Sequence, residues 1–191
     1  QLKINKYSAN NMEKKIAILR GINVGGKKKI LMADLKSMFE GLGYSEVLTY
    51  IQSGNVIFTS ENHITETEMA EAIEIAIKNK FGFDVPVIVL AAKEIQNTFK
   101  NNPFYGTTDT DISKLHVTFL ADEPEIELLN KIQALDFSPD KFDIIGRTVF
   151  IYCEGKYHQS KLTNNFFESK LKTSATTRNL KTVKKLCELS Q

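Results

Sequence analysis

The chain lacks several features that would assign it to a class of protein at once. Its 191 residues include only two cysteines, four prolines and no tryptophan. Two cysteines cannot cross-link a chain of this length, which excludes a disulfide-stabilised scaffold. No stretch approaches the roughly 20 apolar residues of a membrane-spanning helix. The hydrophobic fraction of 42% and the net charge of +2 exclude a disordered chain and indicate a folded globular protein.

Familiar catalytic and metal-binding patterns are missing as well. His63, His116 and His158 lie far apart, with no cysteine or carboxylate at ligand spacing, so we expect no metal site. The sequence contains no Gly-x-Ser-x-Gly segment of the hydrolase type. It also contains neither of the two common glycine-rich phosphate-binding patterns. We therefore expect no cofactor, and the sequence leaves open whether the protein is an enzyme.

The small net charge is the result of a cancellation along the chain. Residues 14–36 carry seven basic side chains and one acidic one, and residues 156–191 carry eight basic and two acidic ones. Residues 37–155 carry 8 basic and 19 acidic side chains. If the two basic segments meet in space they form one positive surface, and otherwise they lie on separate solvated faces. Both possibilities are open at this stage.

Hydrophobic periodicity predicts an α+β fold in two lobes with antiparallel sheets. In the first lobe, residues 12–103, we expect strands at 15–22, 46–51, 55–60 and 85–90 and helices at about 31–42 and 65–82. This βαββαβ order is that of a ferredoxin-like arrangement. A short helix at 92–100 follows. Residues 1–11 are a polar N-terminal extension, either natural or left from cloning, without the apolar core of a signal peptide, and cytoplasmic localisation is the default.

The second lobe, residues 104–191, is expected to repeat this plan in part. Strands are predicted at 114–121, 142–145 and 148–153, with Gly146 in a two-residue hairpin. Helices are predicted from 122 to about 135, from Ser160 onward, and over the last amphipathic segment that contains Leu180. The expected order is βαββαα, related to that of the first lobe.

Three segments could carry chemistry. The first is a glycine- and lysine-rich loop between a strand and a helix, the physical arrangement of an anion site or simply a tight turn with solvated lysines. The second is a hairpin whose polar side chains could face a ligand, although a turn alone explains it. The third is a Thr-Arg-Asn segment that could bind an anion or cap the last helix, with Asn179 or Thr177 as the capping residue. The candidate ligand-binding residues are Arg20, Asn23, Gly25, Gly26 and Lys27 in the first segment, Gln52, Ser53 and Asn55 in the second, and Thr177, Arg178 and Asn179 in the third.

The same three segments resemble the signature segments of the bacterial DUF1697 family, a group of uncharacterised proteins of about this length. The resemblance rests on RGINVGG from Arg20, QSGN from Gln52 and TTRN-x-x-T from Thr176, in this order, within residues 14–189. It implies a two-lobed α+β fold with a ferredoxin-like first part and brings no established activity. Leu180 stands where the resemblance leads us to expect a tryptophan. If that tryptophan stacks on a ligand in relatives, this chain lacks the platform, and if it only packs in the core, Leu180 is a smaller core residue.

These observations favour binding of a phosphate-bearing ligand, a nucleotide or a nucleic acid, by the basic loops 20–29 and 176–182. An alternative is an enzyme that acts on a small anionic metabolite in a cleft between the lobes. A second alternative is a protein-interaction module. We expect no membrane partner, and the sequence does not determine the ligand's identity, the oligomeric state or whether the two basic segments share a face.

Overall fold

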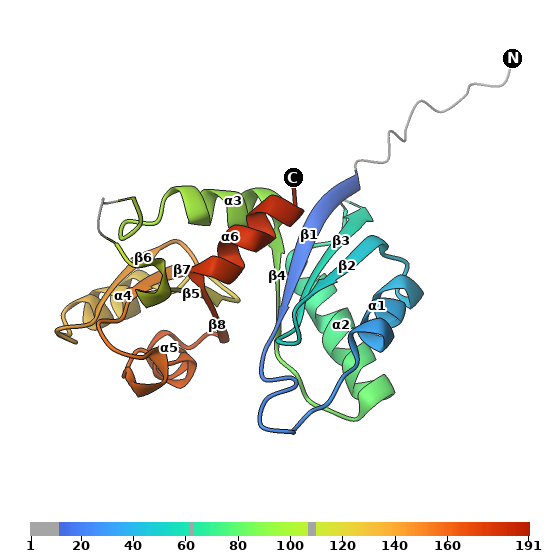
Figure 1. Cartoon of the computed structure of the whole chain (residues 1–191), viewed down its shortest axis with the longest axis horizontal. Helices are drawn as coiled ribbons and strands as arrows, with labels where there is room; N and C mark the ends of the chain where they lie inside the picture. The colour runs from blue at the N-terminus through green and yellow to red at the C-terminus, as the bar shows by residue number, and fades with distance from the viewer. Residues whose placement is uncertain (1–11, 62, 107–109) are drawn as a thin grey trace, which may run out of the picture.

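A computed structural model describes residues 12–61, 63–106 and 110–191, and the predicted N-terminal extension, residues 1–11, lies outside this range. The chain folds into two four-stranded antiparallel sheets with helices on their faces, one sheet from each half of the chain (Figure 1). The predicted α+β class with two lobes is therefore confirmed.

The first half has the predicted βαββαβ order followed by one more helix. Its elements are β1 (Met12–Leu19), α1 (Met32–Gly41), β2 (Ser45–Tyr50), β3 (Asn55–Glu61), α2 (Glu66–Phe81), β4 (Val87–Ala91) and α3 (Ala92–Lys100). The strands pair antiparallel in the order β2-β3-β1-β4. Because β1 lies inside the sheet, its residues Ile16 to Leu19 are buried on both faces. This explains why they form an unbroken apolar run in the sequence.

The second half repeats the topology of the first more fully than the sequence indicated. Its elements are β5 (Leu115–Leu120), α4 (Ile126–Gln133), β6 (Lys141–Ile145), β7 (Thr148–Tyr152), α5 (Asn164–Leu171), β8 (Ala175–Asn179) and α6 (Leu180–Leu189). The strand order is β6-β7-β5-β8, which is equivalent to that of the first sheet. The expected βαββαα order omitted β8. This segment contains Thr-Thr-Arg-Asn and has no apolar alternation, and it becomes a strand by pairing with β5.

Local signals fix several of these boundaries. Thr65 and Glu68 form a capping box at the start of α2, and Gly82 ends that helix in a left-handed conformation with φ of 76°. Asn179 is the N-cap of α6, since its side chain accepts a hydrogen bond from the Thr182 amide over 2.8 Å. Helix α5 begins later than predicted, because Thr163 rather than Ser160 caps it.

Three buried clusters organise the packing. One lies between the first sheet and helices α1 and α2, and another lies between the second sheet and helices α4 and α5. The third joins the inner faces of both sheets with α3 and α6, and therefore draws residues from both halves of the chain. Figure 1 shows α3 along the upper edge of the view beside α6, and α6 between the two halves of the chain. Within the described ranges, no helix has the length and apolar character needed to cross a membrane.

Candidate functional site

The loop between β1 and α1 is held by the side chain of Asn23. Its amide nitrogen donates to the carbonyl oxygens of Ile30, at 3.0 Å, and Gln52, at 2.9 Å. Its amide oxygen accepts from the Ile30 N–H at 2.9 Å. Asn23 itself has a positive φ of 56°, a conformation that asparagine adopts more readily than most residues. One side chain thus closes the loop and attaches it to the β2–β3 hairpin.

The hairpin lies tightly against the end of β1. The Leu19 N–H donates to the Gly54 carbonyl over 2.8 Å. Gly54 has a φ of 83°, and a Cβ atom there would lie 2.7 Å from Ile22 Cδ1 and 2.8 Å from Leu19 Cβ. The buried side chain of Asn55 donates to the carbonyl of Tyr50 at 3.0 Å. Only glycine fits this approach, so the QSGN segment has a structural requirement of its own.

Arg178, on β8 of the second half, reaches into this hairpin. Its Nε donates to Asn55 Oδ1 over 2.7 Å, and its Nη2 donates to the carbonyl oxygens of Leu19, Ser53 and Gly54 at 2.6, 3.0 and 3.3 Å. Its Nη1 donates to the Thr177 carbonyl over 3.0 Å. Burial lowers the pKa of the Arg178 guanidinium to about 10. The group therefore remains charged at neutral pH, and the partners on its described contacts are carbonyl oxygens rather than carboxylates.

Arg20 ties the start of the loop to α5. Its Nη1 is paired with the Glu168 carboxylate and lies 3.3 Å from the Ala175 carbonyl, and its Nη2 donates to Asn165 Oδ1 over 2.8 Å. Arg20, in the first half of the chain, binds the second half, and Arg178, in the second half, binds the first. We call these contacts between the two halves the junction. Both predicted anion-binding arginines therefore have intramolecular partners.

Thr177 of β8 also has partners, whereas the hydroxyl of the buried Thr176 has no hydrogen-bond partner among the described residues. Thr177 Oγ1 lies 2.6 Å from Thr118 Oγ1, donates to Asn164 Oδ1 over 2.6 Å and accepts from the Tyr157 hydroxyl over 3.0 Å. The Tyr157 ring stacks on His116 with the ring centroids 4.4 Å apart. Burial lowers the pKa of the His116 imidazole, an effect that a backbone contact to Lys114 opposes. This cluster faces α5 and links β5, β8 and that helix.

The fold thus brings all three predicted segments together, and it leaves their side chains in different situations. Arg20, Asn55, Thr177, Arg178 and Asn179 are occupied by contacts within the chain. Lys27 and Lys29 are exposed, and their side chains make no ion pair or hydrogen bond with any described residue. Gly25 and Gly26, with φ of 57° and 74°, and Gln52 are exposed beside them.

Two further lysines, Lys78 and Lys80, which no sequence motif indicated, lie beside this loop and its Lys28. Lys28 donates to the backbone carbonyl of Asp84, and Lys78 forms an ion pair with the Asp84 carboxylate at 2.7 Å. Lys80 donates to the carbonyl of Asp34 over 3.1 Å. The C-terminus of α2 is therefore adjacent to the loop. We call the surface formed by Lys27, Lys28, Lys29, Lys78 and Lys80 the basic surface. In the sequence, Lys78 and Lys80 are visible only as two basic residues in the last turn of α2, and nothing there indicates that they lie near the loop.

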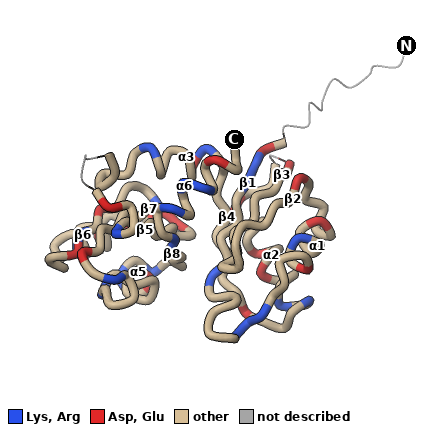
Figure 2. The backbone as a smooth tube through the Cα atoms, viewed as in Figure 1, with Lys and Arg blue, Asp and Glu red and all other residues tan. Residues whose placement is uncertain are grey.

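The two basic ends of the chain lie only partly together. Arg20 binds α5, so the first part of the C-terminal basic segment borders the loop after β1. Figure 2 shows the basic residues of α5 and of this loop toward the lower edge of the view, whereas those of α6 lie toward the upper edge. The linear charge pattern is therefore divided by the fold.

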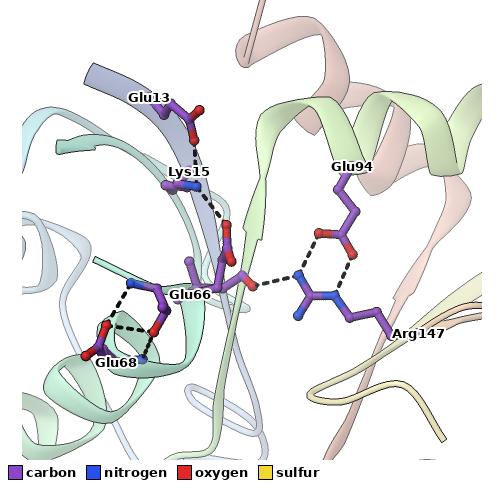
Figure 3. A network of polar contacts seen from close by, with 8 residues as sticks. Glu13, Lys15, Glu66, Glu68, Glu94 and Arg147 are labelled. Carbon is purple, nitrogen blue, oxygen red and sulfur yellow. Dashed lines mark hydrogen bonds and ion pairs between the residues drawn. The ribbon is translucent and has the colours of Figure 1, made fainter. Parts of the chain in front are cut away.

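A second arginine junction lies between the halves. Arg147, in the β6–β7 hairpin, binds both carboxylate oxygens of Glu94 on α3 at 2.6 Å and lies 3.4 Å from the Val89 carbonyl (Figure 3). On the other side of β4, the buried Lys15 pairs with Glu13 and Glu66 at 2.8 and 2.7 Å.

A cavity of about 130 Å³ lies beside this junction, between α2, β4 and the second half. Its ionisable lining residues are Glu66, Glu71, Glu74, Asp122 and Arg147. This acidic lining does not favour an anionic metabolite, the substrate class in our alternative enzyme hypothesis. Among the residues for which coordinates are given, no three His, Cys, Asp or Glu side chains cluster as metal ligands would.

The fold and the junction define a two-lobed α+β protein whose topologically equivalent halves are tied by partly buried arginines. The chain belongs to the family described as "Protein of unknown function (DUF1697)", whose model matches residues 12–150. The resemblance noted in the sequence is thereby confirmed. A similar solved structure is that of the conserved bacterial protein SP0830 from Streptococcus pneumoniae, with a TM-score of 0.74 and 23% identity over 94% of this chain and 99% of that one. At this identity the likeness shows the fold alone. No curated protein sequence matches the chain significantly.

Proposed function

We propose that this protein binds a phosphate-bearing ligand, a nucleotide or a nucleic acid, at the basic surface. The observation that carries the proposal is the state of Lys27 and Lys29. Both ammonium groups are exposed and lack an acidic partner among the described residues, whereas Arg20 and Arg178 are occupied. Charges available on the surface can bind an anion without first breaking a contact within the protein.

The surroundings of these two lysines support the proposal. The basic surface brings five lysines near two aspartates, Asp34 and Asp84, so that its local charge is positive. Gly25, Gly26 and Lys28 have positive φ, which turns the backbone of the loop and exposes it to a ligand. The contacts of Asn23 hold the loop in place, so the loop loses less conformational entropy when a ligand binds.

The proposal gives the third predicted segment a supporting role. Thr177, Arg178 and Asn179 hold β8, the hairpin and the start of α6 in place through contacts already described. They stabilise the surface on which the ligand binds, and Lys27 and Lys29 contact the phosphate.

The test is a titration of a fluorescein-labelled oligonucleotide and of nucleoside triphosphates, followed by anisotropy and thermal shift at several salt concentrations. Binding is expected to weaken as salt rises, and the Lys27→Ser/Lys29→Ser variant should lower the slope of log affinity against log salt by about 0.7 per lysine for a single strand. Lys100→Ser/Lys131→Ser removes two exposed lysines elsewhere and is the matched control. Binding that is absent, independent of salt or unaffected by the loop variant would refute the proposal.

A further inference from the structure

Three exposed apolar residues lie in the β1–α1 loop and in the hairpin that it contacts. Val24, Leu31 and Ile51 have exposed fractions of 63%, 71% and 46%. Val24 and Leu31 flank the lysine run in the sequence, and Ile51 is in the hairpin that the loop contacts. Single exposed apolar residues are common on protein surfaces, but a group of them around unpaired charges indicates an interaction site.

The side chain of Asn23 brings the three together. It lies next to Val24 in the chain and bonds to Ile30, the neighbour of Leu31, and to Gln52, the neighbour of Ile51. Consecutive Cα atoms are only about 3.8 Å apart. Each apolar residue therefore lies one peptide unit from a point that Asn23 holds, which places all three in the same region of the molecule as Lys27 and Lys29.

Ile51 adds an independent observation. Its φ is 53°, in the left-handed region, where a β-branched residue is a true outlier. Such strain is unfavourable and clusters at sites where function uses the residue. Ile51 is 46% exposed, so burial offsets only part of this cost, and glycine would fit the backbone conformation better.

We infer that the ligand of the basic surface is single-stranded nucleic acid, whose phosphates meet Lys27 and Lys29 and whose unpaired bases lie against Val24, Leu31 and Ile51; this rests on the proposed function. A single strand offers phosphates and unpaired bases together, whereas a duplex stacks its bases inside and polyphosphate has none. Free ammonium groups beside exposed apolar residues therefore fit a single strand. A duplex or polyphosphate would contact the ammonium groups and leave the apolar residues without a partner.

The experiment compares three labelled probes on the full chain: a single strand of about 12 nucleotides, the duplex of the same sequence, and inorganic polyphosphate. The single strand is expected to bind about tenfold or more tightly than the duplex. The Val24→Ala/Leu31→Ala variant and the Ile51→Gly variant should each weaken single-strand binding by roughly five- to tenfold and leave duplex binding and the salt slope unchanged.

The controls separate this effect from a loss of folding. Glycine tolerates the φ of Ile51, and alanine at residue 31 adds no capping group to α1. Ile75→Ala/Ile126→Ala removes two apolar side chains that are exposed by 61% and 67% in α2 and α4, and should change nothing.

Several results would overturn the inference. If the duplex and polyphosphate bind as tightly as the single strand, and the apolar variants bind normally, the surface recognises charge alone and the proposed function stands without this refinement. Tighter binding to vesicles of anionic lipid than to the single strand would assign the apolar surface to a membrane. Loss of a dimer in the apolar variants, with nucleic acid binding unchanged, would assign it to a second copy of the chain. No binding of any probe would refute the proposed function as well.

Discussion

Arg178 Nε donates a hydrogen bond to Asn55 Oδ1 over 2.7 Å, although 123 residues separate the two in the chain. The contact connects β8 in the second half with the β2–β3 hairpin in the first. Asn55 lies within residues 12–150, which the family model matches, and Arg178 lies beyond them. A largely buried cation bound by carbonyl oxygens and an amide is costly to desolvate, and its removal would take a donor from Asn55 Oδ1 and from the carbonyl oxygens of Leu19 and Ser53.

The first prediction concerns this junction. Arg178→Ala should lower the free energy of unfolding by about 3 kcal/mol, because Asn55 Oδ1 and several buried carbonyl oxygens lose their donor. Arg178→Lys keeps the charge but lacks the planar guanidinium with its several N–H donors, so its free energy of unfolding should lie between those of Arg178→Ala and the wild type. Urea unfolding followed by circular dichroism measures both. Lys131→Ala is the control, and an Arg178→Ala protein as stable as the wild type would show that the guanidinium does not stabilise the junction.

The second prediction concerns Gly54. Gly54→Ala should destabilise the protein by about 3 kcal/mol, because the added Cβ would contact Ile22 and Leu19 and the residue would also carry a strained φ. Gly43→Ala is a matched control, since Gly43 has a φ of 89° and open space around it. That variant should lose only about 1–2 kcal/mol, from the backbone alone. Equal losses in thermal unfolding would contradict the close approach of the hairpin to β1.

The third prediction concerns the loop. Asn23→Gly keeps a residue that tolerates a φ of 56° and removes the three hydrogen bonds of the side chain. We expect faster hydrogen exchange over residues 20–31 with a small change in global stability. The Asn23→Ala loop should exchange as fast as that of Asn23→Gly. Its free energy of unfolding should be lower by about 1 kcal/mol more, because alanine is strained in this conformation. Protection equal to that of the wild type would mean that Asn23 does not hold the loop.

The fourth prediction is a dependence of stability on pH. Burial lowers the pKa of His116 below its ordinary value of 6.5, so the unfolded chain takes up a proton more readily than the folded protein. The contribution of neutral His116 to the free energy of unfolding is therefore complete above about pH 6.5 and decreases as the pH drops below that value.

Melting temperatures between pH 7.5 and 5.0 measure this effect. His116→Phe should reduce the loss of stability at low pH and can keep the stacking on Tyr157. His158→Asn, a change at an exposed histidine, should leave the loss unchanged. An identical pH profile for wild type and His116→Phe would remove His116 as the cause.

Much of the fold could be predicted because its signals are local. The buried strand β1 is a continuous apolar run, α2 begins with a capping box and ends at a glycine, and Gly146, with a φ of 57°, is in the predicted hairpin. Strand β8 was not predicted, since Thr176 to Asn179 are polar and adopt the strand conformation only through pairing with β5. Pairing between segments that are distant in the chain has no local signature.

The sequence by itself determined the two-lobed α+β class, the order of most elements, the family, and the three segments that meet at the junction. Only the tertiary structure decided how each side chain in those segments is used. In a sequence, an arginine beside an asparagine is equally compatible with a ligand and with an internal contact. Packing of β8 against the hairpin buries Arg178 among carbonyl groups, whereas Lys27 and Lys29 remain exposed. Packing also brings Lys78 and Lys80 to the loop, because the position of a charge in space depends on contacts between segments that are distant in the chain.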